Sequence, residues 1–321
     1  MHNKYITIST DNNEMIYLEI AGRAGNQLFR YAFARKIQIL TGRKLFIDFH
    51  RVYEEKGDFW ENSLKRFKVT EYEEVKDKKI LKKNMSLIQK IIYFWYKSCS
   101  FILKKNKEKQ KAWQMKKQPL LNRFGFCFLE LGYFDYDVEK LKKNKFIYIC
   151  GSFESPKYFD DIRNELLEEF EPKSHIKEEN KMLIEKIRNS ESICVSVRRG
   201  DFLNLNFYNV CNNQYYSKAL NYFKKIYSNP TFVFFSDDIE WCKENLKVDN
   251  CECLYETGKD DVAEKLMVMK QCKNFIISNS TFSWWAQYLS VEKNKKIVSP
   301  SRWYNSKMES DLIDKENWIL M

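Results

Sequence analysis

The sequence is poor in the residues that usually build metal sites. It has only three histidines in 321 residues, and Cys251 and Cys253 stand too close together for an ordinary zinc pair. The nine cysteines are odd in number and lie mostly among apolar neighbours, and residues 1–10 are polar and lack the apolar core of a secretory signal. We therefore expect no structural zinc, reduced thiols and a cytoplasmic location.

An evenly basic surface is also missing, although the formal net charge is +11. Residues 76–118 contain 14 lysines against Asp77 and Glu108, a net charge of +12, which leaves −1 for the rest of the chain. A protein that binds nucleic acid is expected to spread basic and aromatic side chains over its recognition surface. The confinement of the charge to one segment therefore argues against nucleic acid as a partner.

The basic segment contains a 17-residue stretch, 87–103, with apolar residues at helical spacing. Two lysines interrupt this stretch, and it is shorter than the about 20 apolar residues that span a bilayer. Two interpretations stay open: peripheral contact with an anionic membrane from the cytoplasmic side, or an ordinary helix packed on its own domain with solvated lysines. The apolar stripe consists of Ile88, Ile91, Ile92, Trp95, Cys99 and Ile102.

Strand-like and helix-like stretches alternate along most of the chain. This alternation predicts an α/β protein with two parallel sheets, one in residues 1–160 and one in residues 161–321. The expected strands are 15–20, 45–48, 145–150, 193–197, 231–235 and 274–278, and the expected helices include 27–40, 213–226, 238–246 and 261–272.

The most informative stretch is an apolar run, 193–197, that stops at the motif Arg-Arg-Gly-Asp of residues 198–201. Ligands bind beyond the carboxyl ends of parallel strands, and a planar, permanently charged guanidinium suits phosphate. Side chains alternate along a strand, so Ser196 and Arg198 share a face while Arg199 points elsewhere, toward a structural ion pair. Taken alone, the motif is equally compatible with an exposed charged turn.

Three further polar turns are candidate ligand sites. The glycine loop 22–27 lies between a strand and a helix, where main-chain N–H groups and the helix dipole favour an anion; the alternative is that Asn26 only caps the helix. Asp237 and Asp238 end another apolar strand, where a carboxylate suits the N–H donors of a guanine edge, although helix capping explains one of them. Residues 278–282, Ser-Asn-Ser-Thr-Phe, place hydroxyl and N–H groups at a helix start.

These four motifs, in this order, resemble those of the bacterial α-1,2-fucosyltransferases. The family's glycine loop, its His-x-Arg-Arg-Gly-Asp motif, its Phe-Ser-Asp-Asp strand end and its Asn-Ser-Ser-Phe-Ser-Trp-Trp stretch correspond to residues 22–27, 196–201, 235–238 and 279–285. The resemblance is weakest in the basic segment. It implies a GT-B architecture, in which two Rossmann-like domains face each other across a cleft, and it leaves room for the last helix to pack back on the first domain.

The resemblance also implies an activity: the transfer of L-fucose, with inversion, from GDP-fucose to the 2-hydroxyl of a galactose-containing glycan. The enzyme would need neither a metal ion nor a cofactor. It would act in surface polysaccharide or O-antigen synthesis. The first domain would bind the acceptor and the second GDP-fucose. Arg198 would contact the diphosphate; it and Asp201 are the catalytic candidates, and Asp201 has the alternative role of holding the turn. The implied donor-binding residues are Gly25, Asn26, Gln27, Ser196, Arg198, Asp237, Asp238, Ser278, Asn279, Ser280, Thr281 and Phe282.

The sequence departs from the family pattern at two positions. Ser196 replaces the family's histidine, and Lys265 stands where relatives commonly have an acidic residue. Asp135 and Asp137 form an Asp-x-Asp, the metal–diphosphate signature of the other large glycosyltransferase architecture, but a three-residue motif is weak. Two competing functions stay open: the same fold with another sugar nucleotide, and a basic protein that binds membrane or nucleic acid. The sequence singles out no general base.

Overall fold

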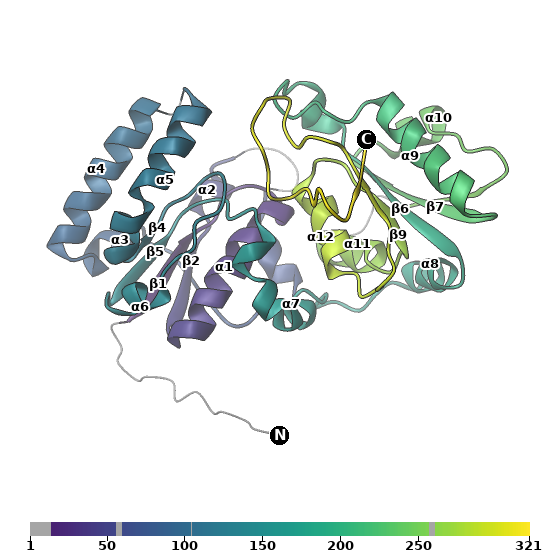
Figure 1. Cartoon of the computed structure of the whole chain (residues 1–321). Coiled ribbons are helices and arrows are strands. Elements are labelled where there is room, and N and C mark those ends of the chain that lie inside the picture. The colour runs from purple at the N-terminus through teal and green to yellow at the C-terminus, as the bar shows by residue number, and fades with distance from the viewer. Residues whose placement is uncertain (1–13, 56–59, 104, 257–260) are drawn as a thin grey trace. The chain divides into compact units, whose positions relative to one another are not determined.

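The computed structural model describes residues 14–55, 60–103, 105–256 and 261–321, which fold into two compact units (Figure 1). The first unit runs to residue 64 and from 69 to 166, and the second comprises residues 65–68 and 167–321. The expected division lay after residue 160. The short segment 65–68 joins the second unit, where Phe67 forms an antiparallel bridge with Pro172. The acceptor and donor roles assigned to the two halves stay predictions.

The first unit is built on a five-stranded parallel sheet with the order β3-β2-β1-β5-β4. Every residue of β1 and β5 is buried, which explains why both strands are largely apolar in sequence. The expected strand–helix–strand opening is confirmed, with the helix beginning at Ala24 instead of residue 27. The strands are β1 (Met15–Glu19), β2 (Lys44–Asp48), β3 (Glu73–Glu74), β4 (Phe126–Cys127) and β5 (Phe146–Ile149).

The helices of the first unit include a hairpin formed by the basic segment. Its two long helices, α4 and α5, pack on each other at the outer side of the unit (Figure 1). One face of α4 packs on the domain core, because Tyr96 is buried and its ring centroid lies 4.9 Å from that of Phe128. The helices are α1 (Ala24–Thr41), α2 (His50–Tyr53), α3 (Lys79–Asn84), α4 (Leu87–Leu103), α5 (Lys107–Arg123) and α6 (Val138–Lys142), and α7 (Arg163–Glu169) lies at the division between the units.

The second unit is built on a six-stranded parallel sheet with the order β11-β10-β9-β6-β7-β8. The chain moves from β6 outward to β7 and β8, then crosses to β9 on the other side of β6. The strand order therefore reverses between β6 and β9, where open α/β sheets bind ligands. The strands are β6 (Glu191–Val197), β7 (Pro230–Ser236), β8 (Glu252–Tyr255), β9 (Asn274–Ile276), β10 (Ile297–Ser299) and β11 (Ile319–Leu320).

The expected strands of this half are confirmed as β6, β7 and β9, and the expected helices 213–226, 238–246 and 261–272 are confirmed as the helices that follow β6, β7 and β8. After α12, the last helix in the described part of the chain, the chain returns to the same sheet as β10 and β11. The helices are α8 (Glu178–Arg188), α9 (Asn213–Ile226), α10 (Ile239–Asn245), α11 (Val262–Met269) and α12 (Thr281–Leu289).

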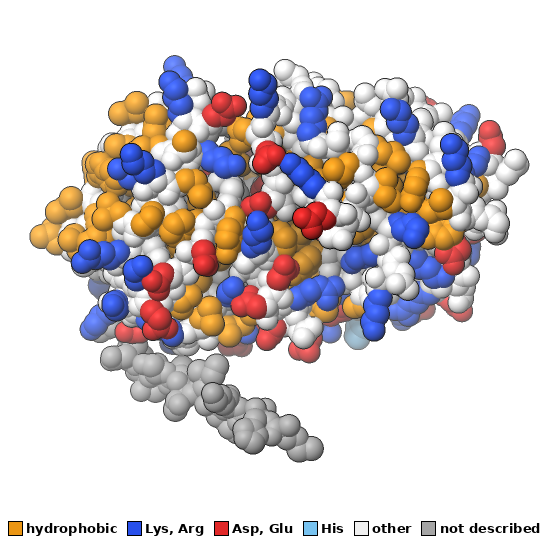
Figure 2. Space-filling model, viewed as in Figure 1, with side chains coloured by type: hydrophobic (Ala, Val, Ile, Leu, Met, Phe, Trp, Pro, Cys, Tyr) orange, Lys and Arg blue, Asp and Glu red, His pale blue; other side chains and the backbone are white. Residues whose placement is uncertain are grey.

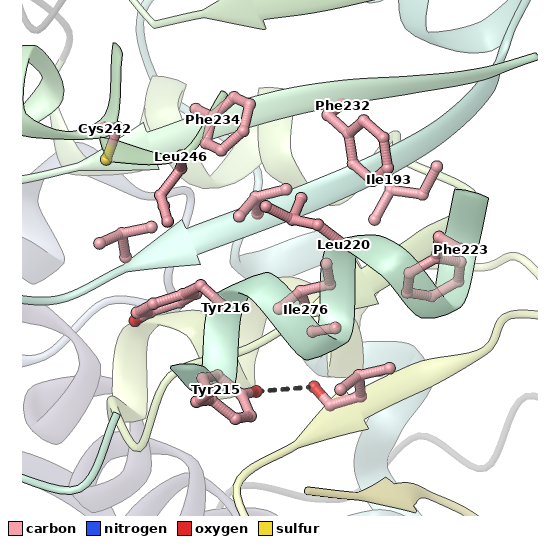
Figure 3. Close-up of a cluster of buried hydrophobic side chains, with 14 residues drawn as sticks. Ile193, Tyr215, Tyr216, Leu220, Phe223, Phe232, Phe234, Cys242, Leu246 and Ile276 are labelled. Atoms are coloured by element: carbon pink, nitrogen blue, oxygen red, sulfur yellow. Dashed lines mark hydrogen bonds between the residues drawn. The ribbon is translucent and has the colours of Figure 1, made fainter. Parts of the chain in front are cut away.

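The core of the second unit joins α9 to the sheet (Figure 3). Leu220 and Phe223 of α9 pack among the buried side chains of the central strands. At the start of the same helix, the Tyr215 hydroxyl donates to the main-chain oxygen of Ile277, at 2.5 Å, and also lies 3.3 Å from that of Val298. Ile277 directly precedes the predicted site residues 278–282, so one buried hydroxyl anchors the entry to that loop.

Replacing Tyr215 with Phe should therefore lower the free energy of unfolding by about 1–2 kcal/mol, because two buried carbonyl oxygens lose a shared donor. Urea unfolding measures the change. Tyr222→Phe is the matched control on the same helix, since no hydrogen bond of its hydroxyl is found among the described residues and its ring only flanks the core. Equal losses in the two variants would contradict the anchoring role.

Candidate functional site

The strongest polar cluster lies at the carboxyl edge of the second sheet. Val197 and Ser236, the last residues of β6 and β7, are paired in register, so the residues that follow them meet at one edge. Arg198 Nη1 lies 2.7 Å from Asp237 Oδ2, and its Nη2 lies 2.5 Å from Asp201 Oδ1. The structure thus brings together both predicted catalytic candidates and one predicted guanine contact. Asp201 holds the turn, the alternative role that the sequence left open.

The second arginine points to different partners. Arg199 Nε lies 3.3 Å from Asp238 Oδ2, and its guanidinium carbon lies 3.7 Å from the centroid of the Trp241 ring. Asp238 also caps α10, because its side chain accepts the N–H of Trp241. The ion pair expected for Arg199 is therefore present, and capping accounts for Asp238.

Asp237 connects the two arginines. Besides the ion pair to Arg198, its Oδ1 accepts the main-chain N–H of Arg199 at 2.9 Å. A Cβ on Gly200 would stand 2.6 Å from Asp237 Oδ2, which explains why this position has no side chain. The Asp237 carboxylate thus contacts three consecutive residues, and these contacts fix the backbone conformation of residues 198–200.

The predicted residues after β9 divide into buried and partly exposed groups. Ser278 and Asn279 are buried, and the Asn279 amide donates to the main-chain oxygens of Tyr208 and Trp303, both at 2.9 Å. Its amide therefore joins two loops. In contrast, residues 280–282 are partly exposed at the start of α12, and the side chain of Ser280 does not cap that helix.

The structure shows the surroundings of both departures from the family pattern. Ser196 is buried in β6, where it is paired in register with Phe235 of β7. Lys265 Nζ lies 2.6 Å from Glu256 Oε2, just beyond β8, and Glu256 Oε1 accepts the main-chain N–H of Ser236 at 2.6 Å. The lysine thus compensates a buried carboxylate that supports the end of β7.

The glycine loop of the first unit is held by Gln27. Its Nε2 donates to the main-chain oxygens of Gly22 and Glu61, at 3.0 and 2.8 Å, and its Oε1 accepts the N–H of Ser63 at 3.0 Å. This fully buried amide is therefore a loop brace. The helix begins after Arg23, so the alternative that Asn26 caps it is wrong.

Of the other two predicted residues in this loop, Gly25 is buried and Asn26 is partly exposed. The donor contacts predicted for residues 25–27 stay predictions.

Sequence reasoning missed a charged network at the carboxyl edge of the first sheet. Glu19, the last residue of β1, accepts from Tyr148 at 2.5 Å and from Arg51 at 2.8 Å. Burial alone would raise the pKa of Glu19, but the charge of Lys97 together with these hydrogen bonds lowers it to about 2. Acidic residues closing two adjacent strands, Glu19 and Asp48, were the available signal.

Glu154, beyond β5, is perturbed in the opposite direction. Burial raises the pKa of this carboxyl to about 7, with a smaller raising effect from Glu130 that the charge of Arg30 opposes. Phe153, just before it, has a φ of 53°, a conformation that non-glycine residues rarely adopt. Its ring stacks on Phe33 at 4.2 Å between centroids, which holds the strained turn in place.

One residue of the Asp-x-Asp motif, Asp137, has a structural role. Asp137 caps α6, because its side chain accepts the N–H of Lys140 and also pairs with the Lys140 ammonium at 2.9 Å. The described part of the chain contains no group of three or more His, Cys, Asp or Glu side chains that could hold a metal ion.

The second unit, with its reversing strand order and polar edge, is a Rossmann-like α/β unit. In units of this kind ligands bind at the switch point. The model of glycosyl transferase family 11 matches residues 15–321, and the chain belongs to this family.

Relatives with curated names match parts of the chain. The O-antigen biosynthesis glycosyltransferase WbnK of Escherichia coli is 32% identical over 142 residues, 41% of this chain and 45% of that protein. An α-1,2-colitosyltransferase of Escherichia coli is 30% identical over 178 residues, 53% and 60% of the two chains. A galactoside α-(1,2)-fucosyltransferase 2 of Bos taurus is 29% identical over 144 residues, 41% and 42%. The chain thus spans about half the length of these relatives.

Among solved structures, NodZ α-1,6-fucosyltransferase soaked with GDP-fucose superposes with a TM-score of 0.48 and 15% identity, covering 86% of this chain and 92% of that chain.

Glu154 makes stability depend on pH. Its folded pKa, about 7, lies above the ordinary value of 4.5, so the folded state binds more protons between these values and loses stability as pH rises through them. Glu154→Gln should remove this loss and raise the free energy of unfolding above about pH 7 by up to about 3 kcal/mol, with no gain near about pH 4.

Urea unfolding at several pH values measures the effect. Glu139→Gln, on exposed α6 of the same unit, is the matched control and should show no such rise. A pH-independent difference for Glu154→Gln would contradict the burial of its carboxyl.

Proposed function

We propose that this chain transfers L-fucose from GDP-fucose, with inversion, to the 2-hydroxyl of a galactose-containing acceptor. The observation that carries the proposal is the Arg198 guanidinium, held by two carboxylates at the ligand-binding edge of a parallel sheet in a member of glycosyl transferase family 11. The names of two relatives, a galactoside α-(1,2)-fucosyltransferase and an O-antigen biosynthesis glycosyltransferase, support it. We extend it to a bacterial surface polysaccharide as the setting of the acceptor.

The reaction breaks the bond between the anomeric carbon of fucose and a β-phosphate oxygen, and joins that carbon to the acceptor oxygen. Negative charge grows on the departing GDP as the bond breaks. We assign Arg198 to the diphosphate, because a fixed guanidinium stabilises charge that appears only in the transition state. Main-chain N–H groups of residues 280–282, at the start of α12, are the second candidate contact.

The two carboxylates beside Arg198 prepare it for this role. A guanidinium has five N–H donors in a rigid fork, and Asp201 and Asp237 each lie against one terminal nitrogen. The planar group is therefore oriented before a donor binds, and less side-chain entropy is lost on binding. N–H donors remain for phosphate oxygens.

The same ion pairs argue against these carboxylates as the general base. Asp201 and Asp237 contact Arg198, and Asp238 contacts Arg199. The carboxylate oxygens that make these contacts are directed at the guanidinium groups and not at an acceptor hydroxyl. We therefore assign all three to positioning, and place the acceptor's base outside this cluster.

A second candidate is transfer of a different sugar through the same linkage. The relative named α-1,2-colitosyltransferase covers more of this chain than the other two relatives described above. Activity with nucleotide-activated colitose but not with GDP-fucose would favour this candidate and leave the site assignment intact.

Replacing Arg198 with Ala should lower the rate of transfer by about 10²–10³-fold, the usual cost of losing one preorganised donor to a developing anion. Arg198→Lys should also lose most activity, because an ammonium lacks the rigid planar fork that the two carboxylates orient. Initial rates with GDP-fucose and a galactoside measure the change, after thermal unfolding has shown that each variant is folded.

Arg188→Ala is the matched control. Arg188 is an exposed arginine of the same unit that binds Gln271 and precedes β6, at the opposite edge of the sheet. Its loss should leave the rate almost unchanged. Activity of Arg198→Ala within about tenfold of the native rate would overturn the assignment to the diphosphate.

Nucleotide binding should raise the melting temperature selectively with GDP. A ligand at about 100 times its Kd stabilises the folded state by about 2.7 kcal/mol, whereas UDP and CMP at the same concentration should have little effect. Thermal-shift titration measures this, and Arg198→Ala should abolish the GDP shift. Equal shifts with all three nucleotides would mean that the guanine assignment is wrong.

A further inference from the structure

The outward face of α4 is apolar. Six large hydrophobic side chains on it have exposed fractions between 50% and 76%. They follow helical spacing and form one stripe along the helix. Figure 2 shows hydrophobic side chains gathered where Figure 1 draws α4. The α4 stripe consists of Leu87, Ile88, Ile91, Phe94, Phe101 and Ile102.

Buried hydrogen bonds on the opposite face of α4 hold the stripe outward. The Gln89 side chain donates to the main-chain oxygens of Phe124 and Phe146, at 2.9 and 3.0 Å. Tyr96 donates to the main-chain oxygen of Phe128 at 3.2 Å and accepts from Gln114 at 2.9 Å. Rotating α4 to bury the stripe would break these bonds in a buried setting, which is costly. The exposure is therefore built into the fold.

Lysines border the α4 stripe on both sides. Lys90 is exposed and lies one helical turn before Phe94, at the same edge of the stripe. On the other side, Lys117 of α5 lies 5.6 Å from the ring centroid of Trp95, which is itself partly exposed. The segment 76–118 as a whole carries 14 lysines and two acidic residues. An apolar stripe with a basic border and an interfacial tryptophan is the pattern of a helix that lies on an anionic bilayer.

Charge decides between a bilayer and a second copy of this chain. A symmetric pair formed through this face would bring two strongly basic segments together. An anionic bilayer instead attracts each lysine near its surface and takes up the apolar side chains. Only two of the six side chains of the α4 stripe, Phe94 and Phe101, are aromatic, so the stripe offers few stacking surfaces for the bases of a nucleic acid.

We infer that the α4 stripe and its bordering lysines dock this protein peripherally on an anionic lipid bilayer, with α4 in the plane of the interface. None of the helices among the described residues is long and apolar enough to cross a bilayer. The inference does not depend on sugar transfer, because it rests on a surface of the first unit alone.

Vesicle co-sedimentation of the full chain tests it. The chain should bind vesicles of phosphatidylcholine with phosphatidylglycerol at least about tenfold more tightly than vesicles of phosphatidylcholine alone. Raising the salt from about 0.05 M to about 0.5 M should weaken this binding, because the lysine contribution is screened. Equal, salt-insensitive binding to both vesicles, or no binding to either, would overturn the inference.

Two sets of variants separate the apolar and basic contributions. Ile91→Ser, Phe94→Ser and Ile102→Ser together should weaken binding to anionic vesicles at least about tenfold. Lys82→Gln and Lys83→Gln, at exposed positions of the preceding helix α3 in the same basic segment, together with Lys90→Gln should weaken it and flatten its salt dependence. The control is Met182→Ser with Val291→Ser, two similarly exposed apolar side chains of the second unit, which should bind like the native chain.

Sedimentation velocity without lipid completes the test. The native chain and the triple-serine variant should sediment alike, since the stripe is assigned to lipid. If the native chain forms a dimer that the triple-serine variant abolishes, and vesicle binding is absent, the face is an interface between copies and the inference is wrong.

Discussion

The carboxylate of Asp237 is the constraint on which the edge of the second sheet depends. It lies beyond β7, yet it binds the side chain of Arg198 and the main-chain N–H of Arg199, both beyond β6. Gly200 passes so close that no Cβ fits. One anion therefore sets the position of the guanidinium, the turn that follows it and the spacing of two strand ends. Ion pairs that are partly shielded from water give the turn a defined geometry. Removing one partner would leave the opposite charge without compensation.

The same bracing extends across the sheet and separates two kinds of motif residue. Glu256 supports the end of β7 and is neutralised by Lys265, while Asn279 ties the end of β9 to two loops. The polar groups of these side chains bind other groups of the protein. Arg198 and residues 280–282 remain partly exposed, so they are the groups that can meet a ligand. A motif shared with a family thus contains a scaffold as well as a binding surface.

The alternation of strand-like and helix-like stretches was enough to predict both parallel sheets and the polar turns that follow their strands, because apolar runs and their ends are local features of the sequence. The residues that these motifs contact could not be predicted from the sequence. Glu256 and Lys265 find each other through the fold, and the Gln27 amide is taken up by Glu61 and Ser63, far along the chain. Strands such as β4 and β11, with two residues each, have no period to detect.

The orientation of α4 could not be predicted from its apolar residues alone. Its sequence has apolar residues around most of the helix, and counting them alone assigns Ile92 and Ile102 to one stripe. In the structure Ile92 packs on the core and Ile102 is exposed. What separates them is a pair of polar residues, Gln89 and Tyr96, whose buried hydrogen bonds select the inward face. A buried polar group has few acceptable partners, whereas an apolar one packs almost anywhere, so the polar positions determine which face a helix shows to its surroundings.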